Sequence, residues 1–536
     1  MSTARRVVAL GLVVVVLAAL AFAGRRASSS SAGAQPTAAD IAAMMPVAAP
    51  AAALSSTFYC AGGGADGGNF DSTIVIANPT DRTVSVVLTA YPGAVDGDAA
   101  GAQAGAALTP KSTSFTITTH NRAEVHLADV VSAPFAAALV EIDSGSIAVE
   151  RRVNGPRGSS TSPCASSPSA TWFSPTGVTT MDARELLAIF NPFADDAVAD
   201  VAFVTSDGFR APPATQGFVV PAGHLSLIDV GVVAGRHDQV AAQVVLRRGR
   251  AVVDRLQSFD GNGGGRPAAV SATATAPSAA PVWIFPQGYV GSGVTETIAI
   301  YNPGAVSSTV DLEITLTDPA VNGTADPIPV TVPAQSYALV ALDQQPRIPQ
   351  GVGFSVVARV TAGPDVVPER VIIGTGDTRV GYGSGLGSPL VGRTWIFADG
   401  RADATTADWL TLFNGSADSI ARVDVAELAQ GSAVPIDGLQ RIEIPPGGRL
   451  EVELGAHINR AALSFVVTSD LPVVAERGLF AVTGSGLGAA LGIPLPDGLA
   501  LAPSAAPATT TTTTTAPSAT TTTTTTAPSS TTTTTP

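Results

Sequence analysis

The chain contains very little lysine and few charged residues of any kind. Lysine occurs once, at Lys111, so arginine supplies nearly all of the positive charge. Charged residues make up 13% of the 536 residues, about half the usual share in a globular protein. The net charge is −14. Because nucleic-acid binding needs a basic surface that displaces counterions, this composition argues against nucleic acid as a partner.

Cysteine is equally scarce, with two residues, Cys60 and Cys164, and neither has the spacing of a metal-binding motif. In an exported chain an even number of cysteines favours a disulfide. We therefore expect a Cys60–Cys164 bridge, which would close a loop of roughly 100 residues and stabilise the fold by about 4 kcal/mol in the chain-entropy model. The alternative is two unrelated buried thiols.

The common catalytic and metal-binding motifs are missing as well. The five histidines form neither HExxH nor a close cluster, and the glycine-rich turns lack both GxGxxG and the lysine of a phosphate loop. No GxSxG nucleophile elbow occurs. The sequence therefore predicts no catalytic residue, no metal ligand and no cofactor, and favours a protein that is not an enzyme.

One long apolar run stands at the beginning of the chain. Arg5 and Arg6 precede apolar residues 7–24, and Ala21-Phe22-Ala23 is a fair cleavage site. This pattern predicts a secretory signal over residues 1–26. Because the run approaches the length that spans a bilayer, an uncleaved membrane anchor is the alternative. In both cases the rest of the chain lies outside the cytoplasm, and only this segment contacts a membrane.

Low-complexity segments flank the central part of the chain. Residues 27–54 are rich in Ala, Ser and Pro and predict a flexible spacer. Residues 501–536 carry three threonine runs separated by Ala-Pro-Ser blocks. Such a segment has almost nothing apolar to bury, so we expect a disordered stalk.

Between these segments the chain repeats itself four times. Each copy has a short apolar stretch that ends in asparagine, at Asn78, Asn191, Asn302 and Asn414. The asparagines are 113, 111 and 112 residues apart. A fixed long period indicates a repeat architecture. We place the repeats at 55–165, 166–275, 276–390 and 391–500.

Two further features recur in every copy. An aromatic residue stands near the start, at Tyr59, Trp172, Trp283 and Trp395. An acid–arginine step closes each copy, as Glu150-Arg151, Asp254-Arg255, Glu369-Arg370 and Glu476-Arg477. The recurrence of both features in all four copies favours a role in specifying the fold.

The apolar pattern within each copy is that of β-strands. The clearest example alternates Val310, Leu312, Ile314 and Leu316 with polar residues, as expected for a strand with one buried face. Several short strands separated by Pro and Gly turns over roughly 100 residues are typical of an immunoglobulin-like sandwich. We therefore predict an all-β protein, a string of about four tandem immunoglobulin-like β-sandwich repeats between an N-terminal apolar export helix and a disordered Thr-rich tail.

The Asn-Pro strand end, the Pro-Gly turn and the closing acid–arginine step resemble the repeats of actinobacterial exported envelope proteins of unknown function. The resemblance covers residues 55–500. It implies an extracytoplasmic setting and β-rich repeats, and it supplies no activity and no catalytic residue. The fourth copy departs from the pattern because Asn414 is followed by Gly415 instead of proline.

The recurring residues allow a structural and a functional interpretation. Neighbouring strand residues point to opposite faces, so the acid and the arginine of one step cannot easily act on one atom. We expect each arginine to bind a neighbouring strand or to stack on the opening aromatic residue. The aromatic residues themselves are expected in the core, with stacking on sugars as the alternative.

Three functions remain open at this level. The first is a non-catalytic envelope or surface protein that binds, spaces or scaffolds other components, with envelope proteins or cell-wall glycans as partners. The second is a carbohydrate-binding array that uses Tyr59, Trp172, Trp283 and Trp395. The third is a hydrolase whose site is assembled between repeats.

Overall fold

The computed structural model describes residues 37–95, 109–263, 265–317, 326–376, 379–429 and 431–504. The predicted export segment at 1–26 and residues 505–536 of the predicted tail lie outside these ranges. The described chain is all-β. Repeats 1 to 3 each have two four- or five-stranded layers with the same order of strands, and the ten strands of repeat 4 are connected through a shared strand. In the described residues, every helix is too short or too polar to cross a bilayer.

Repeat 1 has one sheet in the order β1-β6-β3-β4 and a second in the order β5-β2-β7-β8. Its strands are β1 (Ser56–Cys60), β2 (Asp71–Asn78), β3 (Val84–Val95), β4 (Lys111–Ile117), β5 (Asn121–His126), β6 (Phe135–Ile142), β7 (Ala148–Gly155) and β8 (Gly158–Pro163), and the short helix η1 (Leu127–Asp129) follows β5.

Repeat 2 has the order β9-β15-β11-β12, with β13 also on β11, and a second sheet β14-β10-β16-β17. Its elements are β9 (Thr171–Ser174), β10 (Ala183–Asn191), β11 (Ala197–Thr205), β12 (Gly208–Arg210), η2 (Pro213–Thr215), β13 (Phe218–Val220), β14 (His224–Asp229), α4 (Val230–Val233), β15 (Ala241–Arg248), β16 (Val252–Phe259) and β17 (Ala269–Ala274).

Repeat 3 has the sheets β18-β23-β20-β21 and β22-β19-β24-β25. Its elements are β18 (Val282–Tyr289), β19 (Val294–Asn302), β20 (Ser308–Leu316), β21 (Ile328–Val332), β22 (Ser336–Ala341), η3 (Leu342–Gln344), β23 (Gly353–Ala362), β24 (Val367–Gly374) and β25 (Gly381–Leu386). Strand β20 confirms the predicted alternation, since Val310, Leu312, Ile314 and Leu316 are buried and the residues between them are half-buried.

Repeat 4 follows the same plan, except that one strand, β32, belongs to both sheets. Its elements are β26 (Leu390–Ala402), β27 (Thr406–Phe413), β28 (Ala421–Ala429), β29 (Ser432–Pro435), β30 (Ile442–Ile444), β31 (Arg449–Glu453), η4 (Leu454–Ala456), β32 (Arg460–Ala481), β33 (Leu487–Leu491), β34 (Ile493–Pro494) and β35 (Ala500–Leu501).

The core of each repeat lies between its two sheets. In repeat 1, for example, Ile74 and Ile76 of β2 share one buried cluster with Val86 and Leu88 of β3. The alternating side chains of each strand therefore meet across the two layers, as expected for sheets that each bury one face.

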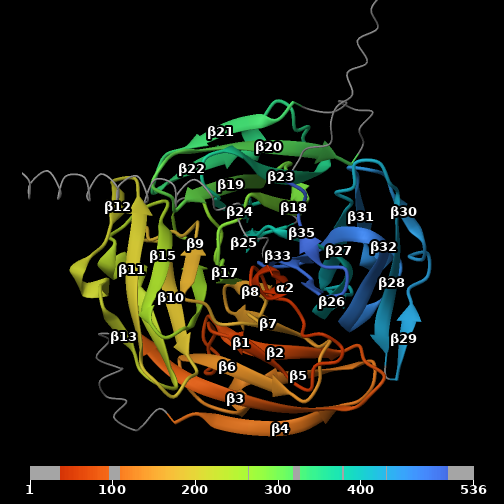
Figure 1. Cartoon of the computed structure of the whole chain (residues 1–536), viewed down its shortest axis with the longest axis horizontal. Coiled ribbons are helices and arrows are strands. Elements are labelled where there is room, and N and C mark those ends of the chain that lie inside the picture. Colours follow the sequence, from red (N-terminus) through yellow and green to blue (C-terminus); the bar gives the residue numbers. More distant parts are fainter. Residues whose placement is uncertain are drawn as a thin grey trace, which may run out of the picture. The chain divides into compact units, whose positions relative to one another are not determined.

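The four repeats form a closed ring instead of the string that the sequence suggested. Strands β8, β17, β25 and β33, one from each repeat, lie at the centre of Figure 1, where each contacts the next and β33 contacts β8. Repeat 4 also contacts repeat 1 through β26 with β7 and β28 with β5. Repeats 1 and 2 are joined by a short parallel pairing of β3 with β14. Residues at the two ends of the repeat region are therefore neighbours in space.

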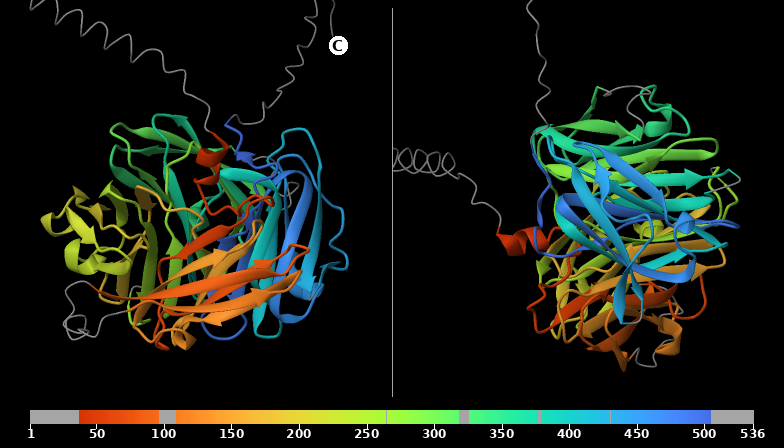
Figure 2. Two further views of the ribbon diagram at one scale, coloured as in Figure 1. Left: turned by 60° about the horizontal axis from the view of Figure 1, so that its bottom comes forward. Right: turned by 90° about the vertical axis from the view of Figure 1, so that its right-hand side faces the viewer.

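The flexible spacer predicted for 27–54 is wrong for the part that the structure describes. Helix α2 (Ala38–Ala42) begins at Thr37, whose side chain forms a capping box with Asp40. The following residues Met45, Val47 and Ala48 are buried against the repeats, because this segment carries apolar side chains that cover the ring. Both views of Figure 2 place α2 and β35 at the same end of the ring.

Candidate functional site

The acid–arginine steps lie on strands β7, β16, β24 and β32, and all eight side chains are buried. Because successive residues of a strand point to opposite faces, the acid and the arginine of one step reach different neighbours. In repeat 1, Glu150 contacts Arg477 of repeat 4, whereas Arg151 contacts Asp254 of repeat 2. The two groups of one step therefore do not share a target atom.

The same pairing occurs at every junction, so that four ion pairs close a cycle. Arg151 Nη1 lies 2.5 Å from Asp254 Oδ2, and Arg255 Nη2 lies 2.5 Å from Glu369 Oε1. The other two pairs join Arg370 to Glu476, and Arg477 to Glu150 at 3.3 Å. Each arginine thus binds the carboxylate of the next repeat, and the last binds the first. We call these four pairs the junction pairs.

Backbone groups of the preceding repeat complete the junction pairs. Gly62, Gln287 and Asp399 donate their backbone N–H groups to Asp254, Glu476 and Glu150, respectively. The carbonyl oxygens of Gly62, Thr176 and Gln287 accept from the arginine of their own repeat. Burying a charge is costly unless it is paired and hydrogen-bonded. Every charge of the junction pairs has an opposite charge beside it, although the Nε atom of each of the four arginines has no hydrogen-bond partner among the described residues.

The expected contact between arginine and the opening aromatic segment exists in two repeats. Arg370 lies over the ring of Phe285 at 5.8 Å, and Arg477 lies over Phe397 at 5.3 Å. Both distances are within the range of a cation–π interaction. The main partner of each arginine, however, is a carboxylate of another repeat, which is a contact that no local sequence pattern identifies.

Three of the junctions contain a second buried acid, which was not predicted from the sequence. Glu185, Glu296 and Asp408 are fully buried, and each stands six residues before the recurring asparagine of its repeat. Repeat 1 has Ser72 at this position. Burial raises the pKa of Glu185 to about 8 and those of Glu296 and Asp408 to about 7. Their recurrence in three repeats was the signal that could have revealed them.

The four recurring asparagines are fully buried and hold the turns that follow them. The Asn302 amide donates to the carbonyl oxygens of Val306, Val332 and Pro333, and its Oδ1 accepts from Gly304 N–H. Asn191 and Asn414 form the same three donated bonds and one accepted bond. Asn78 also donates three, and its Oδ1 accepts from both the N–H and the hydroxyl of Thr80. Each asparagine therefore ties a turn to the adjacent sheet.

Sugar stacking by the opening tryptophans is ruled out in this structure. Trp172, Trp283 and Trp395 are at most 3% exposed. Their indole N–H groups donate to backbone carbonyls, for example Trp172 to Ala251 at 2.9 Å. An amphipathic indole that is satisfied inside the core has no face left for a ligand. Tyr59 of repeat 1 is half-buried.

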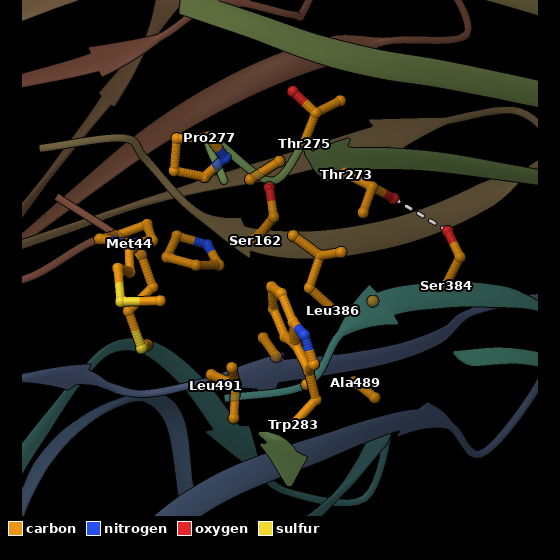
Figure 3. A pocket seen from close by; sticks show the side chains of 17 residues that line it. Met44, Ser162, Thr273, Thr275, Pro277, Trp283, Ser384, Leu386, Ala489 and Leu491 are labelled. Carbon is orange, nitrogen blue, oxygen red and sulfur yellow. Dashed lines mark hydrogen bonds between the residues drawn. The ribbon is translucent and has the colours of Figure 1, made fainter. Parts of the chain in front are cut away.

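A pocket lies where all four repeats meet, and residues of β8, β17, β25 and β33 line it (Figure 3). Its volume is about 50 Å³, and its lining is largely apolar, with Trp283, Leu386 and Leu491 on one side and Met44 from the N-terminal segment on another. The Thr273 and Ser384 hydroxyls lie 2.9 Å apart at its polar edge. Because no titratable side chain lines it, the pocket suits a small apolar group better than acid–base chemistry.

Two further hollows are more polar. One, of about 80 Å³, lies between repeats 4 and 1, where Arg152 pairs with Asp399. The other is an open groove of about 620 Å³ on repeat 1 between β4 and β5. His126 lies on this groove, and its Nε2 is 2.6 Å from Asp71 Oδ2.

Cys60 and Cys164 form a disulfide that joins β1 of one sheet to the residue after β8 of the other. The bridge thus ties the two layers of repeat 1 together. In the ranges that the structure describes, no cluster of three or more His, Cys, Asp or Glu side chains could hold a metal ion.

Comparisons with known proteins give little beyond a family label. The chain resembles no curated protein at a significant level. Among solved structures, it is similar to Thermotoga maritima 1070, with 20% identity over 21% of this chain and 95% of that one, at a TM-score of 0.18. It is also similar to the Anabaena sensory rhodopsin transducer, with 23% identity over 17% of this chain and 80% of that one, at a TM-score of 0.15. TM-scores this low support no argument about fold or function.

One family model matches part of the chain. The matched segment, residues 146–280, runs from β7 of repeat 1 to the end of repeat 2 and includes the first two acid–arginine steps. Over these residues the chain matches a family of unknown function, DUF5719.

Proposed function

We propose that this chain is a non-catalytic extracytoplasmic protein of the cell envelope or surface, which binds, spaces or scaffolds other components. Its repeats are immunoglobulin-like sandwiches of the kind that the resemblance to actinobacterial envelope proteins implies. Its partners are envelope proteins or cell-wall glycans.

The observation that carries this proposal is the use of the recurring charged residues. Every acid–arginine step joins one repeat to the next, and its side chains are buried at the junction. The recurring charged side chains, which are the obvious candidates for catalysis or ligand binding, therefore hold the ring together. A closed ring is suited to presenting binding surfaces on its outside.

Two observations support the extracytoplasmic setting. The Cys60–Cys164 bridge is typical of oxidising compartments. The charged and apolar start of the sequence is typical of an export signal or an anchor. The membrane then contacts the protein only through this N-terminal segment.

The two alternative functions are less well supported. A carbohydrate-binding array loses most of its stacking platforms, because three of the four aromatic residues are buried. A hydrolase between repeats could use the acids of the junction pairs, which are already bound by arginine, or the second buried acids Glu185, Glu296 and Asp408. None of these acids lines any of the three pockets described above. We therefore retain the scaffold as the proposed function.

Protease treatment of intact cells tests the location. The proposal predicts that an added protease degrades the protein while a cytoplasmic marker stays intact. Full protection on intact cells, followed by digestion after lysis, would contradict an extracytoplasmic location.

Co-sedimentation with isolated cell-wall material then distinguishes the partners. The fragment should span residues 37–504, because a start at residue 55 would remove the buried residues Met45, Val47 and Ala48. Saturable binding that soluble wall glycans compete away identifies a glycan partner. Absence of binding directs the search to envelope proteins, through pull-downs from the envelope fraction.

A further inference from the structure

Three aromatic rings surround one arginine side chain at the junction of repeats 3 and 4. The guanidinium carbon of Arg379 lies 4.1 Å from the ring centroid of Tyr289, 4.5 Å from Phe480 and 5.8 Å from Trp409. Tyr289 ends β18, while Trp409 and Phe480 lie on β27 and β32, and β18 contacts both of these strands. We call these three rings the junction cage.

The fold does not require aromatic residues at these positions, since the other three junctions have none. Tyr289 stands six residues after Trp283, Trp409 five before Asn414 and Phe480 three after Arg477. In repeat 1 the count starts at Phe58, because the residue after it, Tyr59, forms the same bridge as the residue after Trp172 and after Trp283. The residues at the same offsets are Gly64, Leu186 and Ser258 between repeats 1 and 2, Val178, Thr297 and Ile373 between repeats 2 and 3, and Arg401, Thr73 and Asn154 between repeats 4 and 1. Three aromatic residues from three different strands therefore meet at only one of the four junctions.

The junction cage is partly exposed to solvent. Phe480 is buried, whereas Tyr289, Trp409 and Arg379 are only partly buried. Burial lowers the pKa of the Arg379 guanidinium, and the carboxylate of Glu451 opposes this shift in part. The negative ring faces and the carboxylate attract a positive charge, and this attraction offsets part of the cost of removing the charge from water.

Another arginine near an aromatic ring, Arg266, differs from Arg379 in its partners. Arg266 lies 5.6 Å from the Phe259 ring, but it also lies 3.8 Å from Asp182 and 3.5 Å from Asp238. Arg266 is therefore held mainly by carboxylates. Arg379, in contrast, contacts three rings at once, which is the arrangement that proteins use to bind organic cations.

We propose that the junction cage formed by Tyr289, Trp409 and Phe480 is a binding site for an organic cation, an alkylammonium or guanidinium group of a partner, and that Arg379 is its internal occupant. The side chain of Arg379 competes with the ligand for the same rings. A ligand gains access when this side chain turns away, so removing it increases the apparent affinity.

Titration of the full-length protein with choline tests this proposal. Binding is followed by tryptophan fluorescence. Trp409 is the reporter, because the other three tryptophans are buried. If Arg379 fills the junction cage about nine-tenths of the time, Arg379→Ala binds choline about tenfold more tightly than the wild type. Adding Tyr289→Leu to Arg379→Ala removes one ring, keeps the reporter and should abolish the gain.

Three controls keep the result interpretable. Arg266→Ala removes an arginine near a ring elsewhere and should leave choline binding unchanged. The neutral isostere 3,3-dimethyl-1-butanol has the same shape without the charge and should not compete. If Arg379→Ala does not fold, as judged by its circular dichroism, Arg379→Met is used in its place, because methionine keeps the apolar stem without the charge.

The outcomes decide between a ligand site and an internal clamp. Saturable choline binding to the Arg379 variant, lost with Tyr289→Leu, supports the proposal. A folded Arg379 variant that shows no saturable response to choline, or that binds the neutral alcohol equally well, overturns it. In that case Arg379 only clamps two repeats together.

Discussion

The recurring asparagines show how a single polar side chain can determine a local fold. Asn302 is fully buried, yet each polar atom of its amide has a partner in the backbone. A buried carbonyl that loses its donor costs roughly 1–3 kcal/mol, so the loss of several donors at once is severe. The recurrence of these asparagines could be seen in the sequence, but their hydrogen-bond acceptors could not. Two of the three carbonyl groups that accept from Asn302 belong to residues about 30 positions further along the chain.

Replacing this amide tests its role at the residue scale. Asn302→Ala should lower the free energy of unfolding by about 3 kcal/mol, because three carbonyl oxygens lose a donor. Urea denaturation of the purified protein measures the change. The exposed Asn459→Ala is the matched control, with an expected change within about 0.5 kcal/mol. Equal effects of the two substitutions would contradict the assignment.

The buried acids make stability depend on pH in an unusual direction. Burial raises the pKa of Glu185 to about 8, and both of its carboxylate oxygens lack a hydrogen-bond partner among the described residues. Between the ordinary pKa of a glutamate, about 4.3, and about 8, the folded chain keeps this proton while the unfolded chain has lost it. The contribution of Glu185 to stability therefore falls as the pH rises through this window.

Glu185→Gln removes the titration while keeping the shape of the protonated acid. The variant should gain stability relative to the wild type as the pH rises from about 5 to 8, by about 1.4 kcal/mol per pH unit at most. Denaturation curves at several pH values measure this difference, with the exposed Glu443→Gln as the control. A difference between Glu185→Gln and the wild type that stays constant with pH would show that Glu185 does not titrate in this range.

Strands and their periodicity were the best predicted elements. The alternating residues of β20 lie as expected, and the four asparagines mark four equivalent strands, β2, β10, β19 and β27. The segment at 37–50 was predicted incorrectly, because its Ala- and Pro-rich composition hides a few apolar side chains that cover the ring. Composition measures the average of a segment, whereas burial depends on single residues such as Met45 and Val47.

The pairing between strands of different repeats was beyond the reach of the sequence. Glu150 and Arg477 are 327 residues apart, and a contact at that separation leaves no local periodicity. What the sequence did contain was the recurrence of the acid–arginine step and the rule that neighbours on a strand face opposite ways. Together these indicate that each step contacts two different surfaces, without identifying the second surface as the next repeat.

A double-mutant cycle tests the junction pair between β7 and β32. Glu150→Leu should destabilise the protein by about 3–5 kcal/mol, since it leaves the Arg477 charge buried and unpaired, and Arg477→Met should be similarly costly. The double variant should recover most of the loss, because an apolar pair of similar volume carries no unpaired charge. Strictly additive losses, measured by chemical denaturation, would mean that the two residues do not interact.

At the scale of the whole molecule, the junction pairs convert a linear series of repeats into a cycle. Each repeat offers a carboxylate to one neighbour and an arginine to the other, so the same interface is used four times and closes on itself. Positions that do not take part in the junction pairs can carry different residues at each junction, as those of the junction cage do. This separates the residues that build the ring from those available for binding.

Small-angle X-ray scattering of residues 37–504 tests this closure most directly. A compact chain of this length should have a radius of gyration of about 23 Å. Four similar domains in an extended string would give roughly twice that value, about 45 Å. The account predicts the smaller radius and a compact particle, whereas a radius near the larger value would contradict the closed ring.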